Sequence, residues 1–206
     1  MLGLLISFGI SFGLLIVAMT VHEFAHGWTA YKLGDTTAKY SGRLTLNPMA
    51  HIDPVWTLLV PLILFISTQW RFVFGAAKPV PFNYWALKNP RRDVFLIGIS
   101  GPLSNFIFAS LLSGIAHVVP LSSTMAFLLV NLILINVVLG VFNLIPIPPL
   151  DGSRIFSSLL PESLSQRFEQ MAPITFIILL ALIWTGALNY VIWPAVNFIL
   201  RLLGVG

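Results

Sequence analysis

Four long apolar runs without a charged side chain are the feature that most limits how this chain can fold. They occupy Met1–Val21, Val94–Val119, Ala126–Ile145 and Ile174–Trp193. A membrane-spanning helix needs about 20 mostly apolar residues, and continuous rather than alternating runs exclude an outer-membrane β-barrel. Only 9% of the residues are charged, against about 25% in a soluble domain. We therefore predict an all-α polytopic membrane protein with about four transmembrane helices, at 3–33, 94–119, 126–145 and 174–193.

Two shorter segments do not fit this pattern of spans. Residues 54–67 are apolar but only 14 long, and they contain Pro61; a span needs roughly 17–25 residues. We therefore expect a re-entrant or interfacial hairpin there. Residues 36–53 are polar with partial alternation and contain the turn signal Asn47-Pro48, which favours a small β-strand region. An edge strand at Ala38–Leu46 would be able to bind an extended peptide as an added strand.

The distribution of basic residues indicates how the helices are oriented. If residues 54–67 do not cross the membrane, ten of the eleven lysines and arginines lie on one side, and Arg201 alone lies on the other. If the segment crosses, the division is seven to four. Loops rich in Lys and Arg remain in the cytoplasm, so we expect the first arrangement, with both termini outside the cell. The net charge of +4 fits such loops better than it fits nucleic-acid binding.

The sequence His22-Glu23-Phe24-Ala25-His26 lies inside the first predicted helix. Residues four apart are about 40° apart around a helix, so His22 and His26 share one face, with Glu23 beside them. Two such imidazoles can bind one Zn²⁺, and the adjacent carboxylate can accept a proton from a water molecule. A chance match is the alternative, but ionisable residues inside a membrane helix are costly and usually functional. The motif therefore indicates a metal site.

A catalytic zinc site needs a third protein ligand. The chain has no cysteine, which excludes thiolate ligands. Asp151 is the strongest candidate, because three prolines between positions 146 and 149 end the preceding span and leave Asp151 on irregular backbone. Such backbone is tolerated at membrane depth only where it is buried or lines a cavity. The alternative is an ordinary Asp-Gly turn. The four-span arrangement brings Asp151 to the same membrane face as the two histidines.

Other polar residues lie close to these motifs. His117 is at the far end of its predicted span, and we do not expect it to bind the metal. His51 lies in the polar segment, where it is either a solvated loop residue or a residue that faces the metal site or the substrate. Asn136 and Asn143 are seven residues apart and so lie nearly on one helix face. For Asn136 we favour a hydrogen bond between helices.

His22–His26, Ser100–Asn105 and Asn143–Gly152 together resemble the motifs of the site-2 protease family of intramembrane zinc metalloproteases. Gly42–Pro48 and Lys78–Pro81 are similar to the compact bacterial and archaeal members, which have no PDZ domain. The resemblance covers most of the chain. Because two separate motifs flank the same pair of predicted spans, the match is specific.

The resemblance implies a role for each matching residue. One Zn²⁺ per chain would be bound by three ligands, His22, His26 and Asp151. Glu23 would act as general base and acid. Asn143 would hold the substrate backbone, and Asn105 would bind the substrate or its developing oxyanion.

We therefore expect residues 1–206 to form a single integral membrane metalloprotease domain. It would hydrolyse peptide bonds of transmembrane or membrane-associated substrates near the cytoplasmic face of the cell membrane. Its partners would be a transmembrane protein or peptide substrate and the lipid bilayer, and no nucleic acid. The alternative is a non-proteolytic metal-binding membrane protein or a transporter subunit. Such a protein would not need Glu23, and a transporter is expected to contain repeats with paired broken helices, which this sequence does not show.

Overall fold

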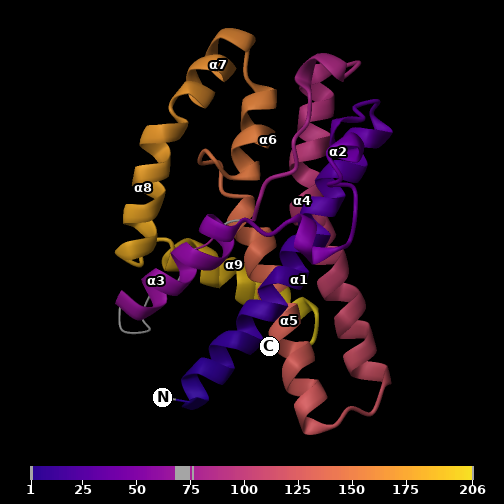
Figure 1. The fold of residues 1–206 in the computed structure, drawn as a ribbon, viewed down its shortest axis with the longest axis vertical. Coiled ribbons are helices and arrows are strands. Elements are labelled where there is room, and N and C mark those ends of the chain that lie inside the picture. Colours follow the sequence, from indigo (N-terminus) through magenta and orange to yellow (C-terminus); the bar gives the residue numbers. More distant parts are fainter. Residues whose placement is uncertain (1, 68–74, 76, 206) are drawn as a thin grey trace.

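The computed structural model describes residues 2–67, 75 and 77–205, and over these residues the chain is helical and has no β-strand (Figure 1). The elements, in chain order, are α1 (Leu2–Lys32), α2 (Thr37–Tyr40), η1 (Pro48–Ala50), η2 (Pro54–Leu59), α3 (Val60–Ser67), η3 (Tyr84–Ala86), α4 (Pro90–Val118), α5 (Ser123–Asn143), α6 (Asp151–Leu159), α7 (Glu162–Gln170), α8 (Ala172–Trp184) and α9 (Asn189–Leu202). The helical part of the predicted fold class is confirmed.

Three helices, α1, α4 and α5, are long and apolar enough to cross a membrane, and α4 packs against the other two. Ile97 of α4 shares a buried cluster with Ala30 of α1, and Ala109 of α4 shares another with Ile133 of α5. These helices match three of the predicted spans to within a few residues. Among the described residues, the structure therefore has three candidate membrane spans.

The fourth predicted span, 174–193, is broken. Helix α8 ends at Trp184 after 13 residues, which is about 20 Å of helix and shorter than the ~30 Å hydrocarbon core of a bilayer. Gly186 then has a φ of +73° and turns the chain. Helix α9 starts at Asn189 and packs across α5. A fourth span exists only if α7 and α8, which are bent by 57° relative to each other, cross the membrane together.

The prediction of a β-strand region at residues 36–53 is wrong. The buried carboxylate of Asp35 starts α2, because it accepts hydrogen bonds from the backbone N–H and the hydroxyl of Thr37 at 2.9 and 2.5 Å. Gly42 has a φ of +70°, and the next two backbone amides donate to the carbonyl oxygen of Ala38 at 2.8 and 3.2 Å. This described stretch satisfies its backbone groups by local turns, so it offers no strand edge to a peptide.

Residues 54–67 form one short apolar helical segment, in which the π-helical turn η2 continues into α3. The Asp53 carboxylate caps its start by accepting hydrogen bonds from the N–H groups of Trp56 and Val55, both at 2.9 Å. The bond from Trp56 contributes most to lowering the pKa of Asp53. As predicted, the segment is not among the helices long enough to cross a membrane. The returning arm of the predicted hairpin would fall mostly on residues 68–74 and 76, which lie outside the described residues.

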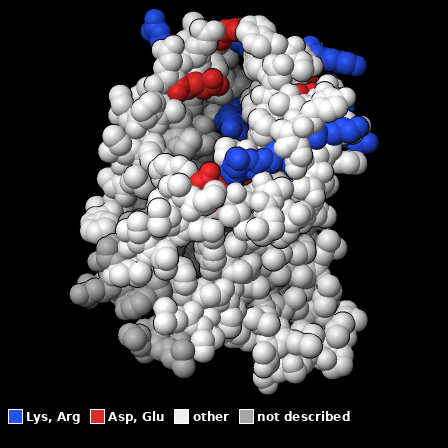
Figure 2. Space-filling view, in the orientation of Figure 1, with Lys and Arg blue, Asp and Glu red and all other residues white. Residues whose placement is uncertain are grey.

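The charged side chains gather at one end of the molecule (Figure 2). This end holds α2, α6, α7 and the start of α4, whereas the visible face around the opposite ends of α1, α4 and α5 carries no charged residue (Figures 1 and 2). The molecule therefore has one polar end and one apolar end along the direction of its spans.

Candidate metal centre

Three side chains that are able to hold a metal ion meet at the start of α6. His22 and His26 project from one face of α1, and Asp151 is the first residue of α6. Asp151 Oδ2 lies 2.9 Å from His22 Nε2 and 3.1 Å from His26 Nε2, and the two Nε2 atoms are 3.1 Å apart. All three residues are at most 6% exposed. The structure therefore brings together the three side chains that the sequence put forward as ligands.

The link between α5 and α6 positions Asp151. Its three prolines have no backbone N–H, so α5 ends at Asn143 and the chain reaches α6 through short turns. Gly152 follows Asp151, and a Cβ atom on it would lie 2.5 Å from the carbonyl oxygen of Ile145. Only glycine fits this approach of backbone to backbone. The Asp-Gly pair, which also suits an ordinary turn, is needed here to bring the carboxylate against α1.

A chain of two amides orients His22. Asn105 Oδ1 lies 2.6 Å from His22 Nδ1, and Asn105 Nδ2 donates to Asn136 Oδ1 at 2.8 Å and to the carbonyl oxygen of Ala18 at 3.2 Å. Asn136 Nδ2 donates in turn to the carbonyl oxygen of Leu132 at 2.8 Å. Because a backbone carbonyl can only accept, both amides have one permitted orientation. His22 Nδ1 must then carry the proton, which leaves its Nε2 lone pair toward Asp151.

His26 has the same tautomer for a simpler reason. Its Nδ1 lies 2.7 Å from the carbonyl oxygen of Ile97, which can only accept a hydrogen bond. Gly101 lies against both imidazoles, because a Cβ atom on it would be 2.5 Å from His26 Cε1 and 2.7 Å from His22 Cε1. Gly98 of α4 is also closely packed, against Ile155 and Arg154 of α6, whereas Gly101 packs against the two histidines.

The donor atoms fit a zinc ion. Two imidazole Nε2 lone pairs and one carboxylate oxygen face one another within 4.8 Å, and lone pairs at this spacing repel unless a cation lies among them. Two nitrogen ligands and one oxygen ligand form a set typical of catalytic zinc, which keeps a fourth position open. Burial opposes ionisation of Asp151, but positive charge on the adjacent imidazoles of His26 and His22 outweighs it and lowers the pKa of its carboxyl well below the ordinary range, and a bound cation would supply the same positive charge to neutral imidazoles. The carboxylate is therefore ionised, as a metal ligand must be.

A cavity of about 410 Å³ opens beside these three side chains. Glu23, Trp56 and Asn143 line it together with the candidate ligands. The Glu23 carboxylate accepts a hydrogen bond at Oε2 from the backbone N–H of Val80 at 2.9 Å. Asn143 Nδ2 donates to the carbonyl oxygen of Leu139 at 3.0 Å. Asn105 is fully buried and does not line this cavity, so its position differs from that expected of a substrate-binding residue.

The segment that carries Val80 is fastened at two points. Asp35 is 1% exposed, and its Oδ2 accepts a hydrogen bond from the backbone N–H of Asn83 at 2.5 Å. The carbonyl oxygen of His51 accepts one from the backbone N–H of Lys78 at 2.9 Å. We call residues 77–83 the strap. Asp35 was missed as a site residue in the sequence, where Leu33-Gly34-Asp35 indicated only the end of a helix.

The remaining polar residues have structural contacts. His51 is 3% exposed, with its Nε2 lying 2.9 Å from the carbonyl oxygen of Thr45, so the interpretation as a solvated loop residue is wrong. His117 Nδ1 lies 2.8 Å from the carbonyl oxygen of Ser113, and His117 is outside the candidate metal group. The interhelical hydrogen bond favoured for Asn136 is confirmed by its contact with Asn105.

Comparisons with known proteins agree with this geometry. The sequence pattern of peptidase family M50 matches residues 120–183, which include Asp151. A Bacillus subtilis protein, YwhC, is 40% identical over 192 residues, which cover 89% of this chain and 84% of YwhC. A Mycobacterium tuberculosis protein, Rip2, is 30% identical over 195 residues, which cover 92% of this chain and 72% of Rip2. Both carry the name "Putative zinc metalloprotease".

A more distant relative comes from an archaeon. Zinc metalloprotease MJ0392 of Methanocaldococcus jannaschii is 29% identical over 157 residues, which cover 76% of this chain but 36% of that protein. No solved structure matches the chain.

Proposed function

Because the chain belongs to peptidase family M50, the site-2 proteases, and is a zinc metalloprotease with membrane-spanning helices, we propose that it cuts membrane-spanning or membrane-associated proteins near the cytoplasmic face. One observation carries this proposal: the three candidate ligands and Glu23 line a single cavity together with apolar residues of α1, α5 and α8. A substrate segment that lies in the membrane would therefore have direct access to the site.

In this proposal Zn²⁺ is held by His22 Nε2, His26 Nε2 and Asp151 Oδ2. When bound, the ion supplies a Lewis acid beside the carbonyl group that is cut. The hydrogen bonds at the two Nδ1 atoms keep both Nε2 lone pairs available, and orienting contacts of this kind strengthen metal sites. Gly101 leaves the imidazoles the space that they occupy.

Glu23 would accept the proton of the attacking water and return it to the leaving nitrogen. The Val80 N–H holds Oε2, so Oε1 is the oxygen that remains for the water among the described contacts. Asn143 would hold the substrate backbone: its Nδ2 donates to Leu139, and its Oδ1 would accept a hydrogen bond from a substrate N–H. A substrate helix must unwind first, because the amide groups of a helix are already hydrogen-bonded to one another.

The distribution of Lys and Arg side chains supports a position of the site near the cytoplasmic side of the membrane. The Lys and Arg side chains visible in Figure 2 lie at the end of the molecule that holds α6 and α7, and positively charged ends of membrane proteins remain inside the cell. The site would then lie just within the cytoplasmic leaflet, where the polar loops give water access.

Purified protein mixed with single-span test substrates tests this function, with the wild type beside Glu23→Gln. The wild type should cut within the substrate, and Glu23→Gln should lose cleavage by at least about a hundredfold, since an amide cannot accept the proton. Zinc content, measured on both proteins, should be equal. Full cleavage by the variant would show that Glu23 is structural. Equal zinc without any cleavage by the wild type would favour a non-proteolytic metal-binding protein.

A further inference from the structure

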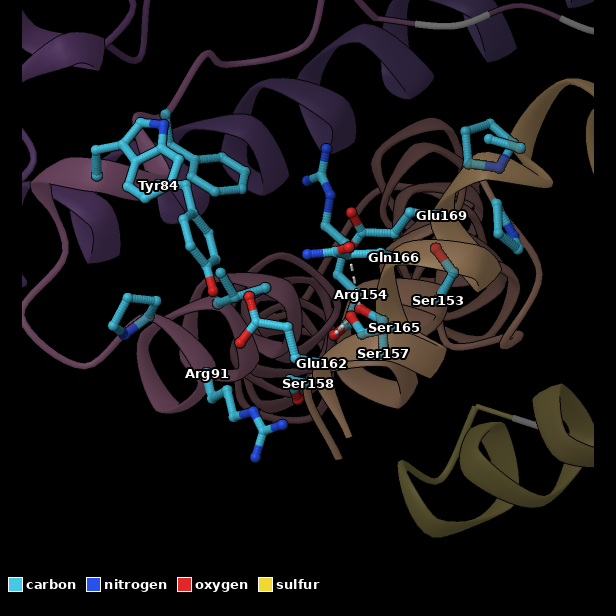
Figure 3. A pocket seen from close by; sticks show the side chains of 17 residues that line it. Tyr84, Arg91, Ser153, Arg154, Ser157, Ser158, Glu162, Ser165, Gln166 and Glu169 are labelled. Carbon is cyan, nitrogen blue, oxygen red and sulfur yellow. Dashed lines mark hydrogen bonds between the residues drawn. The ribbon is translucent and has the colours of Figure 1, made fainter. Parts of the chain in front are cut away.

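A second cavity, of about 560 Å³, opens at the charged end of the molecule between the start of α4, η3 and helices α6 and α7 (Figure 3). Pro149 and Arg154 line both this cavity and the metal-site cavity. These residues flank Asp151 in the chain, and Arg154 Nη1 lies 3.4 Å from Asp151 Oδ1. The second cavity therefore lies next to the metal-site cavity, on the side of the polar end of the molecule.

The walls of this cavity combine two kinds of surface. The side formed by Phe82 and η3 carries aromatic rings, including Tyr84 and Trp85, and Trp85 is 89% exposed. The side formed by α6 and α7 carries hydroxyl and amide groups, including Ser157, Ser165 and Gln166 (Figure 3). An extended peptide needs hydrogen-bond partners for its backbone and apolar contacts for its side chains. A cavity of this size holds a few residues of such a chain.

The cavity is lined by two carboxylates, Glu162 and Glu169, and by two guanidinium groups, Arg91 and Arg154. Arg154 already contacts Asp151, and its guanidinium carbon lies 5.4 Å from the ring centre of Phe82. Arg91 extends away from the other labelled residues in Figure 3. Glu162 and Glu169 form no ion pair within the described part of the chain, and Glu169 accepts a hydrogen bond from the Ser157 hydroxyl at 3.2 Å.

We propose that this cavity binds the basic segment that flanks the transmembrane part of the substrate on its cytoplasmic side. The proposal rests on the proposed function, because it requires the polar end to face the cytoplasm. Cytoplasmic flanks of transmembrane helices are rich in Lys and Arg. A substrate chain leaving the metal-site cavity past Arg154 enters the second cavity in extended form and brings its cations to Glu162 and Glu169. Exposed ion pairs are individually weak, so the selectivity is several-fold.

Binding of labelled peptides tests the proposal without catalysis. In the Glu23→Gln protein, a single-span peptide with a lysine-rich cytoplasmic flank is compared with one that has glutamines in place of the lysines. The lysine peptide should bind about five- to tenfold more tightly, as expected for two exposed ion pairs. Adding Glu162→Gln and Glu169→Gln should remove this difference and leave the affinity for the glutamine peptide within about twofold.

The matched control places the same change of net charge outside the cavity. Ser163→Lys and Gln170→Lys lie on the same helix, are exposed and do not line the cavity. This pair should reduce the preference for lysine less than the two glutamate substitutions do, because its charges lie outside the cavity. With Glu23 restored, the Glu162→Gln and Glu169→Gln protein should show a higher KM for the lysine substrate and an unchanged kcat.

The outcomes separate this proposal from the proposed function. Equal binding of the two peptides to the protein with both glutamates intact would overturn the proposal, even if the doubly changed variant failed to fold. An equal loss of the preference for the lysine peptide in the protein with Ser163→Lys and Gln170→Lys would also overturn the proposal. Failure of the proposed function has a different signature: neither peptide is cut when Glu23 is present.

Discussion

The amides of Asn105 and Asn136 connect the metal site to the backbone of α5, and both residues are fully buried. The direction of this chain is set at the Leu132 carbonyl, which can only accept, and it ends at His22 Nδ1. A histidine that binds a metal usually needs such a partner to fix its tautomer and ring position. Asn105 therefore acts on the metal through His22, as a positioning residue.

Replacing Asn136 tests this chain at a distance from the metal. Asn136→Ala should raise the Kd for zinc about tenfold and Asn105→Ala about ten- to a hundredfold, because Asn105 contacts His22 directly. Competition with a chromogenic chelator measures both values. Asn131→Ala is the control, since Asn131 lies on the same helix and its amide donates only to its own helix at Phe127. Unchanged zinc affinity in both variants would contradict the positioning role.

The ligand assignment itself is tested by zinc content. His22→Ala, His26→Ala and Asp151→Ala should each remove most of the one zinc expected per chain, because three protein ligands are the minimum of catalytic zinc sites. Atomic absorption of the purified proteins measures this. His117→Ala should keep its zinc, since His117 Nδ1 lies against the Ser113 carbonyl oxygen of its own helix and its ring lies near Gly204, away from the candidate ligands. Full occupancy in Asp151→Ala would show that another group completes the site.

At the scale of elements, the strap is held to the end of α1 by Asp35 and in turn holds Glu23 through Val80. Asp35→Asn replaces an accepting oxygen with a donor that faces the N–H groups of Thr37 or Asn83. Loss of a buried hydrogen bond to a charged group costs about 1.5–3 kcal/mol. In the Asp35→Asn protein we expect faster trypsin cleavage at Lys78 than in the wild type, because the strap is held less firmly. We also expect a lower kcat, because the strap holds Glu23, and an unchanged zinc content.

Asp53→Asn is the matched control for the strap. Asp53 caps the start of η2 through two local backbone hydrogen bonds; within the described contacts its carboxylate forms no hydrogen bond to the strap, and only the charge of Lys78 acts on it. Its replacement should leave trypsin cleavage at Lys78 close to that of the unchanged protein. An equal effect of both substitutions would mean that trypsin reports general loosening of the loops.

The sequence predicted the elements and site residues whose signals are local. Helical spacing placed His22 and His26 on one face, and the length of the apolar runs identified α1, α4 and α5. The break between α8 and α9 was missed because the whole run has no charged residue and Gly186 is its only glycine. The turns at residues 36–53 were taken for strands because weak alternation does not reveal hydrogen bonds made through Asp35. The contact of Asn105 with His22 depends on tertiary packing, which no spacing encodes.

At the scale of the whole molecule, the orientation in the membrane is the next question. The charged end should face the cytoplasm, because Lys- and Arg-rich loops are retained there. Single cysteines at Ser41, Ala86 and Ser163, all exposed positions in a chain without cysteine, should resist an impermeant thiol reagent added outside intact cells. A cysteine at Ser122, between α4 and α5, should react. Labelling at Ala86 but not at Ser41 would show that residues 54–67 cross the membrane.

The candidate ligands are far apart in the chain, and this has a consequence for biosynthesis. Asp151 is 129 residues from His22 and 125 from His26, and α4 and α5 are synthesised before it. At about 5–20 residues per second, the ribosome needs roughly 6–25 s to pass from one motif to the other. During that interval the nascent chain carries two histidines and the general base but no complete metal site. A translation product that stops early is therefore unable to cut its neighbours in the membrane.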